Sequence, residues 1–385
     1  MLTFGGIALF LPLIREDLQM SFSQGGMLSA GSTLTYALGQ VPAGYLSDRF
    51  GAKRLFFVGI LGATTLSLLF GLVDSFGMAM ANLLASGVFR ALVFVPGLTL
   101  ISSWFPSDRR ATAMGLYVMG GLMGNILLSL IGPALVVQYG WRFPFILFSA
   151  LGIGVAFAYR ALGKDAPAAV PRHHILMRDA LRLVRHRIMW VCAALQFIRY
   201  GTYISFIFWL PSLLVADRGM TVQEAGLVVA MSSAFTGPSN ALGGYVSDRL
   251  RNPALVIGAS LAVLACTSSL LVLTHSIPIL LLVIAINSIF LQFYFGPLFL
   301  VPVEVLGQRV AGLSTGFSNL FANIGALVFA YSLGVVKDKA GAFTLGFFGI
   351  TLACAIGVVL SVVLARVRNS ALAEQPSSSE NAESR

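Results

Sequence analysis

The sequence has few charged residues. Only 10% of its 385 residues are Asp, Glu, Lys or Arg, whereas 57% are hydrophobic. A soluble protein usually carries about 25% charged residues, enough to cover a surface that faces water. With so little charge, most of the surface must face lipid, and the composition therefore indicates a membrane protein.

Cysteine and histidine are also scarce. The 3 cysteines lie inside apolar runs, and the 4 histidines lie near predicted helix ends or in a polar segment. We therefore expect no disulfide framework and no metal site. The chain has no GxxxxGK[ST] motif and no nucleophile–base–acid pattern, so we expect no ATP hydrolysis, no enzyme activity and no cofactor.

Long apolar runs fill most of the chain. A spanning helix needs about 20 mostly apolar residues. The runs predict an all-α membrane protein with twelve helices, near 1–14, 22–46, 55–73, 77–104, 111–138, 142–162, 188–215, 222–246, 254–274, 278–303, 310–335 and 342–366. The first run spans only about 21 Å at 1.5 Å per residue, so we expect that residues are missing before Met1.

The helices are divided into two sets of six. We expect a first half at 1–162, a basic linker at 163–187, a second half at 188–367 and a disordered tail at 368–385. The tail is rich in Ser, Glu, Asn and Ala, which cannot bury enough apolar surface to fold.

The net charge of +10 is explained by membrane topology and gives no reason to expect a nucleic-acid partner. The basic residues fall between apolar runs, and most lie on one side: Arg49, Lys53, Arg54, Arg109, Arg110, Arg160, Lys164, Arg172, Arg178, Arg182, Arg185, Arg187, Arg249, Arg251, Arg309, Arg366 and Arg368. Because Lys and Arg are enriched in cytoplasmic loops, both termini of this multi-pass inner-membrane protein are predicted to be cytoplasmic. The stretch 178–187 is also compatible with contact to anionic lipid, but a topology signal is the interpretation that we favour.

The two halves share a sequence repeat. Gly44–Arg49 reads Gly-Tyr-Leu-Ser-Asp-Arg, and Gly244–Arg249 reads Gly-Tyr-Val-Ser-Asp-Arg. The offset of 200 recurs at Gly26 and Gly226. Two similar halves in the same orientation imply a pseudo-two-fold axis along the membrane normal, with a transport site between them.

The same offset relates two helix starts. Ser21-x-x-Gln24 and Thr221-x-x-Glu224 are capping boxes, in which each side chain bonds the backbone amide of the other residue. They predict that a helix begins directly after Ser21 and another directly after Thr221.

The loop after the second predicted helix resembles the signature loop of the major facilitator superfamily. The matching residues are Gly44, Asp48, Arg49, Gly51, Lys53 and Arg54, and a shortened second copy keeps Gly244, Asp248 and Arg249. The resemblance implies transport by alternating access. It also implies that Asp48 caps the start of the helix at 310–335 and holds the outward-open state, with Asp248 acting likewise near 111–138. The alternative is that Asp48 and Arg49 only fix topology.

Two arginines fall in the middle of predicted helices. They are Arg90 and Arg199, and no acidic residue lies at a comparable depth. Charges inside the membrane are costly and usually functional. In the family, the first, fourth, seventh and tenth helices line the cavity, so both arginines would face the substrate. A guanidinium suits carboxylate or phosphate. The segments 198–201 and 209–211 also resemble organic-anion facilitators, including organophosphate antiporters. A structural arginine bonded to backbone carbonyls is the alternative.

Polar residues near these arginines complete the predicted binding set. Gln196 and Tyr203 share a helical face with Arg199, and Asn287 and Tyr294 share a face of 278–303. Gln292 is predicted to point elsewhere. Hydrogen bonding between helices is the alternative role for these residues.

The sequence therefore predicts a monomeric secondary transporter, a symporter or exchanger of a small organic anion such as a carboxylate, coupled to a proton or counter-anion. Multidrug or metabolite efflux by proton antiport is the alternative, and the lack of a carboxylate within the membrane weakens it. A receptor without transport activity is a third possibility.

Overall fold

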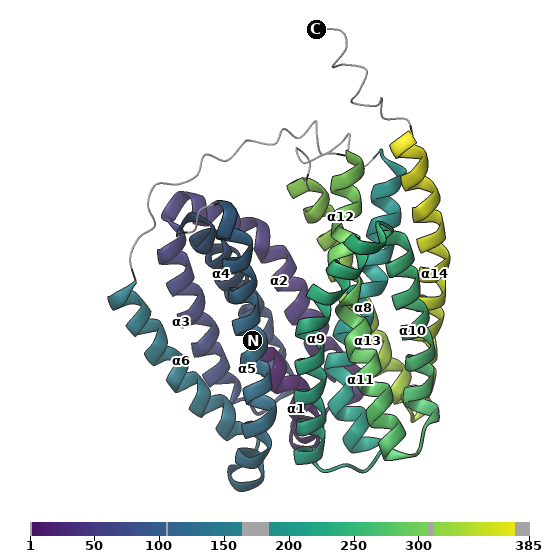
Figure 1. Ribbon diagram of the computed structural model, residues 1–385. Helices are drawn as coiled ribbons and strands as arrows, with labels where there is room; N and C mark the ends of the chain where they lie inside the picture. The colour runs from purple at the N-terminus through teal and green to yellow at the C-terminus, as the bar shows by residue number, and fades with distance from the viewer. Residues whose placement is uncertain (1, 105–106, 164–184, 307–310, 374–385) are drawn as a thin grey trace.

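A computed structural model describes residues 2–104, 107–163, 185–306 and 311–373, and these residues form helices without any strand (Figure 1). The first group contains α1 (Leu2–Asp17), α2 (Phe22–Phe50), α3 (Ala52–Phe70), α4 (Phe76–Trp104), α5 (Ser107–Tyr139) and α6 (Arg142–Leu162). The second group contains α8 (Arg187–Ala216), α9 (Val222–Leu250), α10 (Pro253–Leu273), α11 (Ile277–Phe293), α12 (Phe295–Leu306), α13 (Ala311–Ala340) and α14 (Thr344–Ala373).

The predicted helix starts are confirmed at both capping boxes. The Ser21 side chain accepts from the Gln24 amide at 3.1 Å, and the Thr221 side chain accepts from the Glu224 amide at 3.2 Å. The α2 helix ends at Phe50, and the following Gly51, whose φ is +87°, allows α3 to begin at Ala52. The tight turn explains why the signature loop places a glycine there.

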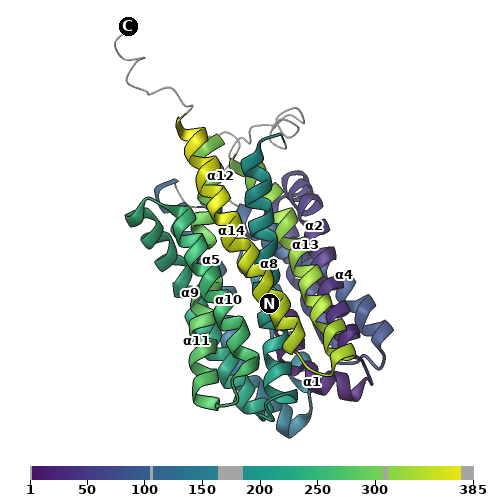
Figure 2. The same ribbon diagram turned by 90° about the vertical axis from the view of Figure 1, so that its right-hand side faces the viewer.

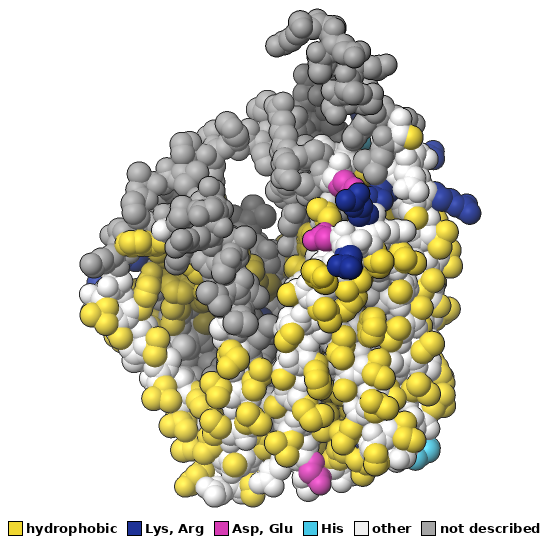
Figure 3. Space-filling view, viewed as in Figure 1, with side chains coloured by type: hydrophobic (Ala, Val, Ile, Leu, Met, Phe, Trp, Pro, Cys, Tyr) yellow, Lys and Arg dark blue, Asp and Glu magenta, His cyan; other side chains and the backbone are white. Residues whose placement is uncertain are grey.

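The helices match the membrane in length and composition. Eight helices within the described part are long and apolar enough to span it, with α11 and α12 together counted as one. Hydrophobic side chains cover most of the described surface in Figure 3, and the visible Lys and Arg lie near one end. The helices α2 and α9 are not among the eight because both contain many Gly, Ser and Thr residues.

The polar helices α2 and α9 lie where the two groups meet. At this interface α2 packs against α13, α5 packs against α9, and α1 packs against α8 (Figures 1 and 2). Small residues allow such close packing of membrane helices. We call the end where α6 finishes and α8 begins the linker end, and the other the distal end.

The predicted helix at 278–303 is interrupted at Tyr294. Pro297 lacks the amide that would bond the Phe293 carbonyl, and its ring would clash with that carbonyl. The carbonyl oxygen of Phe293 instead lies against Gly243 of α9, where a Cβ atom would overlap it. The missing side chain at Gly243 therefore makes room for the break.

The predicted boundary of the tail at 368 was wrong, because α14 continues to Ala373. Arg368 donates from Nε and Nη2 to the two carboxylate oxygens of Glu304, at 2.8 and 2.6 Å. This paired contact with α12 fixes the helix beyond its apolar part. The predicted linker lies mostly outside the described residues, at 164–184.

Candidate functional site

Arg199 is buried within the second group of helices. Its side chain is 2% exposed. Nε donates to Gln196 Oε1 at 2.7 Å, and Nη1 donates to Gln292 Oε1 at 3.1 Å. The guanidinium also lies 5.6 Å from the Tyr200 ring centre and 4.8 Å from that of Phe295. Two neutral amides and two rings therefore hold a cation without neutralising it.

The break in the tenth predicted helix explains part of this geometry. Gln292 lies just before the break and Phe295 just after it, and both face Arg199. Gln292 points away from Asn287, as predicted, but it is Gln292 and not Asn287 that faces Arg199. Asn287 lies five residues earlier, about 140° around the helix, and donates to Thr267 of α10 at 2.8 Å.

The structure thus separates Asn287 from Arg199. Tyr294 is fully buried at the break and lies near Arg199 and Cys354. Asn287 and Gln292 both lie within the continuous α11, so regular helical geometry sets their relative directions. The sequence shows that these two residues lie on different faces, but it does not show which of the faces meets Arg199.

Arg90 belongs to the first group and is half-buried. From α4, its Nη1 donates to the Ser32 hydroxyl of α2 at 2.8 Å, and its guanidinium lies 5.1 Å from the Tyr36 ring centre. Tyr200 of α8 lies near both Arg90 and Arg199. One tyrosine is therefore shared by the arginines of the two groups.

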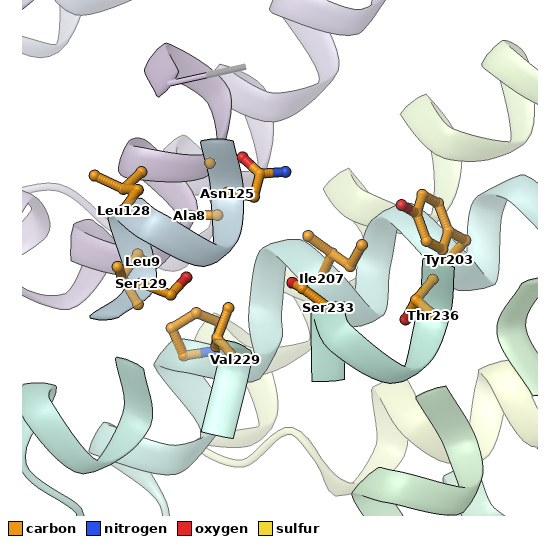
Figure 4. Close-up of a pocket in the computed structure, with 12 residues that line it drawn as sticks. Ala8, Leu9, Asn125, Leu128, Ser129, Tyr203, Ile207, Val229, Ser233 and Thr236 are labelled. Atoms are coloured by element: carbon orange, nitrogen blue, oxygen red, sulfur yellow. The ribbon is translucent and has the colours of Figure 1, made fainter. Parts of the chain in front are cut away.

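Tyr203 links Arg199 to a small cavity. Its ring stacks on Tyr200 with centres 5.9 Å apart, and its hydroxyl lies near Gln292. The cavity has a volume of about 30 Å³ and lies between the two groups (Figure 4). It is lined by Gly5, Ala8 and Leu9 of α1, Asn125, Leu128 and Ser129 of α5, Tyr203, Ile207 and Pro211 of α8, and Val229, Ser233 and Thr236 of α9.

The signature residues lie at the linker end, away from Arg199. Arg49, Arg54 and Asp248 are exposed, and Lys53 is half-buried. The Gly44 position is near Val95 of its own group, and a Cβ at Gly244 would meet nothing within 4 Å. Arg249 donates to the Tyr245 hydroxyl at 3.5 Å.

The gating role of these residues stays a prediction, because the Asp48 side chain and residues 307–310 lie outside the described part. Among the described residues, no group of three His, Cys, Asp or Glu side chains is arranged to bind a metal ion.

The fold and the site can now be compared with known proteins. The sequence pattern of the Major Facilitator Superfamily matches residues 1–330. The chain belongs to this superfamily. The family predicted from the signature loop is therefore confirmed, and the chain is a multi-pass membrane protein.

Several relatives match nearly the whole transporter. A probable galactarate/D-glucarate transporter of Escherichia coli (strain K12) is 25% identical, over 88% of this chain and 84% of the relative. A hexuronate transporter of Bacillus subtilis (strain 168) is 24% identical, over 94% and 89%. A probable sulfoacetate transporter of Cupriavidus necator is 23% identical, over 93% and 89%.

A solved structure confirms the fold. The inward-facing, unoccupied crystal structure of a bacterial homologue of the human lysosomal transporter Spinster has a TM-score of 0.78 and 19% identity, and the match covers 96% of this chain and 93% of that one. At this identity the likeness concerns the fold alone.

Proposed function

We propose that this protein is a secondary active transporter of a small organic anion in the inner membrane. Twelve spans form two six-helix halves around a pseudo-two-fold axis along the membrane normal. Alternating access moves the anion past Arg199 of the second half and Arg90 of the first half. The linker end faces the cytoplasm, because the loops rich in Lys and Arg lie there.

The environment of Arg199 carries this proposal. A buried cation held by neutral amide oxygens keeps its charge available to an anion, and a guanidinium presents paired donors that match a carboxylate. Gln196 and Gln292 fix the orientation of the group before substrate arrives. Such preorganisation reduces the entropic cost of binding.

The relatives support the same class of substrate. The names of three of them refer to galactarate and D-glucarate, to hexuronate, and to sulfoacetate. All of these are small organic acids. They differ in that the sugar acids carry several hydroxyl groups and sulfoacetate carries none.

Uptake into proteoliposomes tests the function. Purified protein is reconstituted and given radiolabelled galactarate, glucuronate or sulfoacetate, with and without a pH gradient or internal unlabelled anion. We expect at least one acid to accumulate above empty vesicles. Stimulation by an inward proton gradient indicates symport, and stimulation by internal anion indicates exchange. Uptake of neutral or cationic compounds alone would contradict the proposal.

A further inference from the structure

The cavity beside Tyr203 is lined by neutral groups. Asn125 and Ser129 come from α5, Ser233 and Thr236 from α9, and Tyr203 from α8 (Figure 4). Amides and hydroxyls can both donate and accept hydrogen bonds. The cavity's volume of about 30 Å³ is large enough for a water molecule or a hydroxyl group of similar size.

Asn125 lines this cavity and has an unused acceptor. Its Oδ1 atom is buried and has no hydrogen-bond partner among the described residues. A Cβ at Gly5 of α1 would come within 2.5 Å of this oxygen, so the glycine makes room for it. A buried polar atom without a partner costs free energy, and a hydroxyl of a bound ligand would supply the missing donor.

The cavity adjoins the predicted anion site along α8. Tyr203 lies one helical turn beyond Arg199 and lines the cavity, and its hydroxyl lies near Gln292, which accepts from Arg199. We propose that the substrate is a hydroxylated organic acid, whose carboxylate binds Arg199 and whose hydroxyl group binds Asn125. This inference rests on the proposed function and selects the sugar acids over sulfoacetate.

Binding of galactarate and adipate to the purified transporter tests this subsite. The two diacids have the same carbon chain, but only galactarate carries hydroxyl groups. We expect galactarate to bind at least about tenfold more tightly, because an unpaired polar group in the site penalises adipate. The Asn125→Leu variant should lose about tenfold in galactarate affinity and little in adipate affinity.

Asn82→Leu is a matched control, because Asn82 donates to the Leu66 carbonyl within the first group and does not line the cavity. Size-exclusion chromatography checks the folding of each variant. If the wild type binds both diacids equally, or sulfoacetate more tightly than galactarate, the hydroxyl subsite is wrong while anion transport stands. If no anion binds, the proposed function fails as well.

A second inference concerns the distal end, where α13 caps α2. The carboxylate of Asp338 accepts hydrogen bonds from the amides of Phe22, at 2.8 Å, and Ser23. Both are among the first amides of α2, which have no partner within their own helix. A carboxylate at this position also interacts favourably with the helix dipole.

Close packing surrounds this cap. The Phe22 ring lies 6.0 Å from Trp209 and 5.5 Å from Phe343 of the second group. A Cβ at Gly26 would come within 2.9 Å of the Ala330 carbonyl oxygen. The two groups are therefore in contact at the distal end, and this contact must break if that end opens.

We infer that Asp338 is a latch that holds the distal end closed. The α2 and α13 helices are antiparallel, so this cap would mirror the one predicted for Asp48 at the linker end. Both α2 and α9 begin with a capping box of their own, and the carboxylate of Asp338 is an additional cap on α2. The helix pair α2 and α13 would thus carry one latch for each state of the cycle.

Distance measurements between spin labels test the latch. The labels are attached to cysteines that replace Ser75 and His275, two exposed residues in distal loops of the two groups. The exposed Cys266 is first changed to Ser so that it is not labelled. We expect Asp338→Ala to raise the ratio of distal-open to distal-closed protein about fivefold, as the loss of a helix cap predicts.

Asp74→Ala is the control, since Asp74 pairs with Arg142 inside the first group. It should leave the distances unchanged. If Asp338→Ala leaves them unchanged as well, or shifts them as little as the control does, Asp338 is not a latch.

Discussion

Arg199 and Arg90 lie in long helices of opposite groups, but their surroundings differ. Arg199 is 2% exposed and is held by amides from α8 and α11 beside a helix break, whereas Arg90 is half-buried on a continuous α4 and contacts a hydroxyl of α2. The second group therefore holds a fixed anchor, and the first group presents a more accessible cation. Substitutions in the two groups should have unequal effects.

The largest effect is expected at Gly243, which makes room for the break between α11 and α12. In Gly243→Ala, the new methyl group would overlap the Phe293 carbonyl oxygen, so α9 and α11 would have to separate. We expect a loss of about 3 kcal/mol in stability, the upper part of the range for overpacking. Thermal unfolding in detergent measures it.

Gly244→Ala is the matched control for that change, because a Cβ there meets nothing within 4 Å. Its unfolding temperature should stay near that of the wild type. Equal unfolding temperatures for the two variants would mean that α9 does not support the break.

The next effect concerns the two charges. Arg199→Gln should weaken anion binding roughly thirty-fold or more, because breaking a buried charge pair costs about 2–5 kcal/mol. Arg90→Gln should have a smaller effect, about tenfold, the lower end of the range of about 1.5–3 kcal/mol for hydrogen bonds to charged groups. Binding of radiolabelled galactarate to purified protein measures both.

Arg199→Lys tests whether geometry matters besides charge. The guanidinium contacts Gln196 and Gln292 through different nitrogens, which a single ammonium group cannot reproduce. We therefore expect Arg199→Lys to bind nearly as weakly as Arg199→Gln. Wild-type affinity in both glutamine variants would overturn the anion proposal.

A smaller effect should distinguish the two faces of α11. Gln292→Leu removes the acceptor of Arg199 Nη1 and should weaken anion binding about tenfold, because hydrogen bonds to charged groups contribute about 1.5–3 kcal/mol. Asn287→Leu breaks only the bond to Thr267 and should lower stability without changing affinity. The reverse result would mean that Asn287, as predicted from the sequence, and not Gln292 belongs to the binding site.

The sequence predicted features that depend on local chemistry. Apolar runs located the spanning helices, and the boxes at Ser21 and Thr221 located two helix starts. The contacts of Gln292 and Asp338 were missed for two physical reasons. Helical periodicity shows which residues share a face but not which face meets Arg199, and the cap on α2 joins residues far apart in the sequence. No periodic pattern reports such a contact.

The smallest effect is expected at the linker end. Asp48→Ala should slow galactarate uptake about fivefold, if the carboxylate caps α13 in the outward-open state. Affinity should change less than severalfold, because the residue lies far from Arg199. Uptake at the wild-type rate would leave Asp48 only a topological role.

Combining the two latch variants sharpens this test. Asp48→Ala should favour the distal-closed state, and Asp338→Ala should favour the distal-open state. The two positions act at opposite ends of α2, about 39 Å apart for the 26 residues from Phe22 to Asp48 at 1.5 Å per residue. Effects of distant sites add, so the opposite shifts should cancel in the double variant. Its spin-label distances should then return close to those of the wild type, whereas two purely structural defects would accumulate.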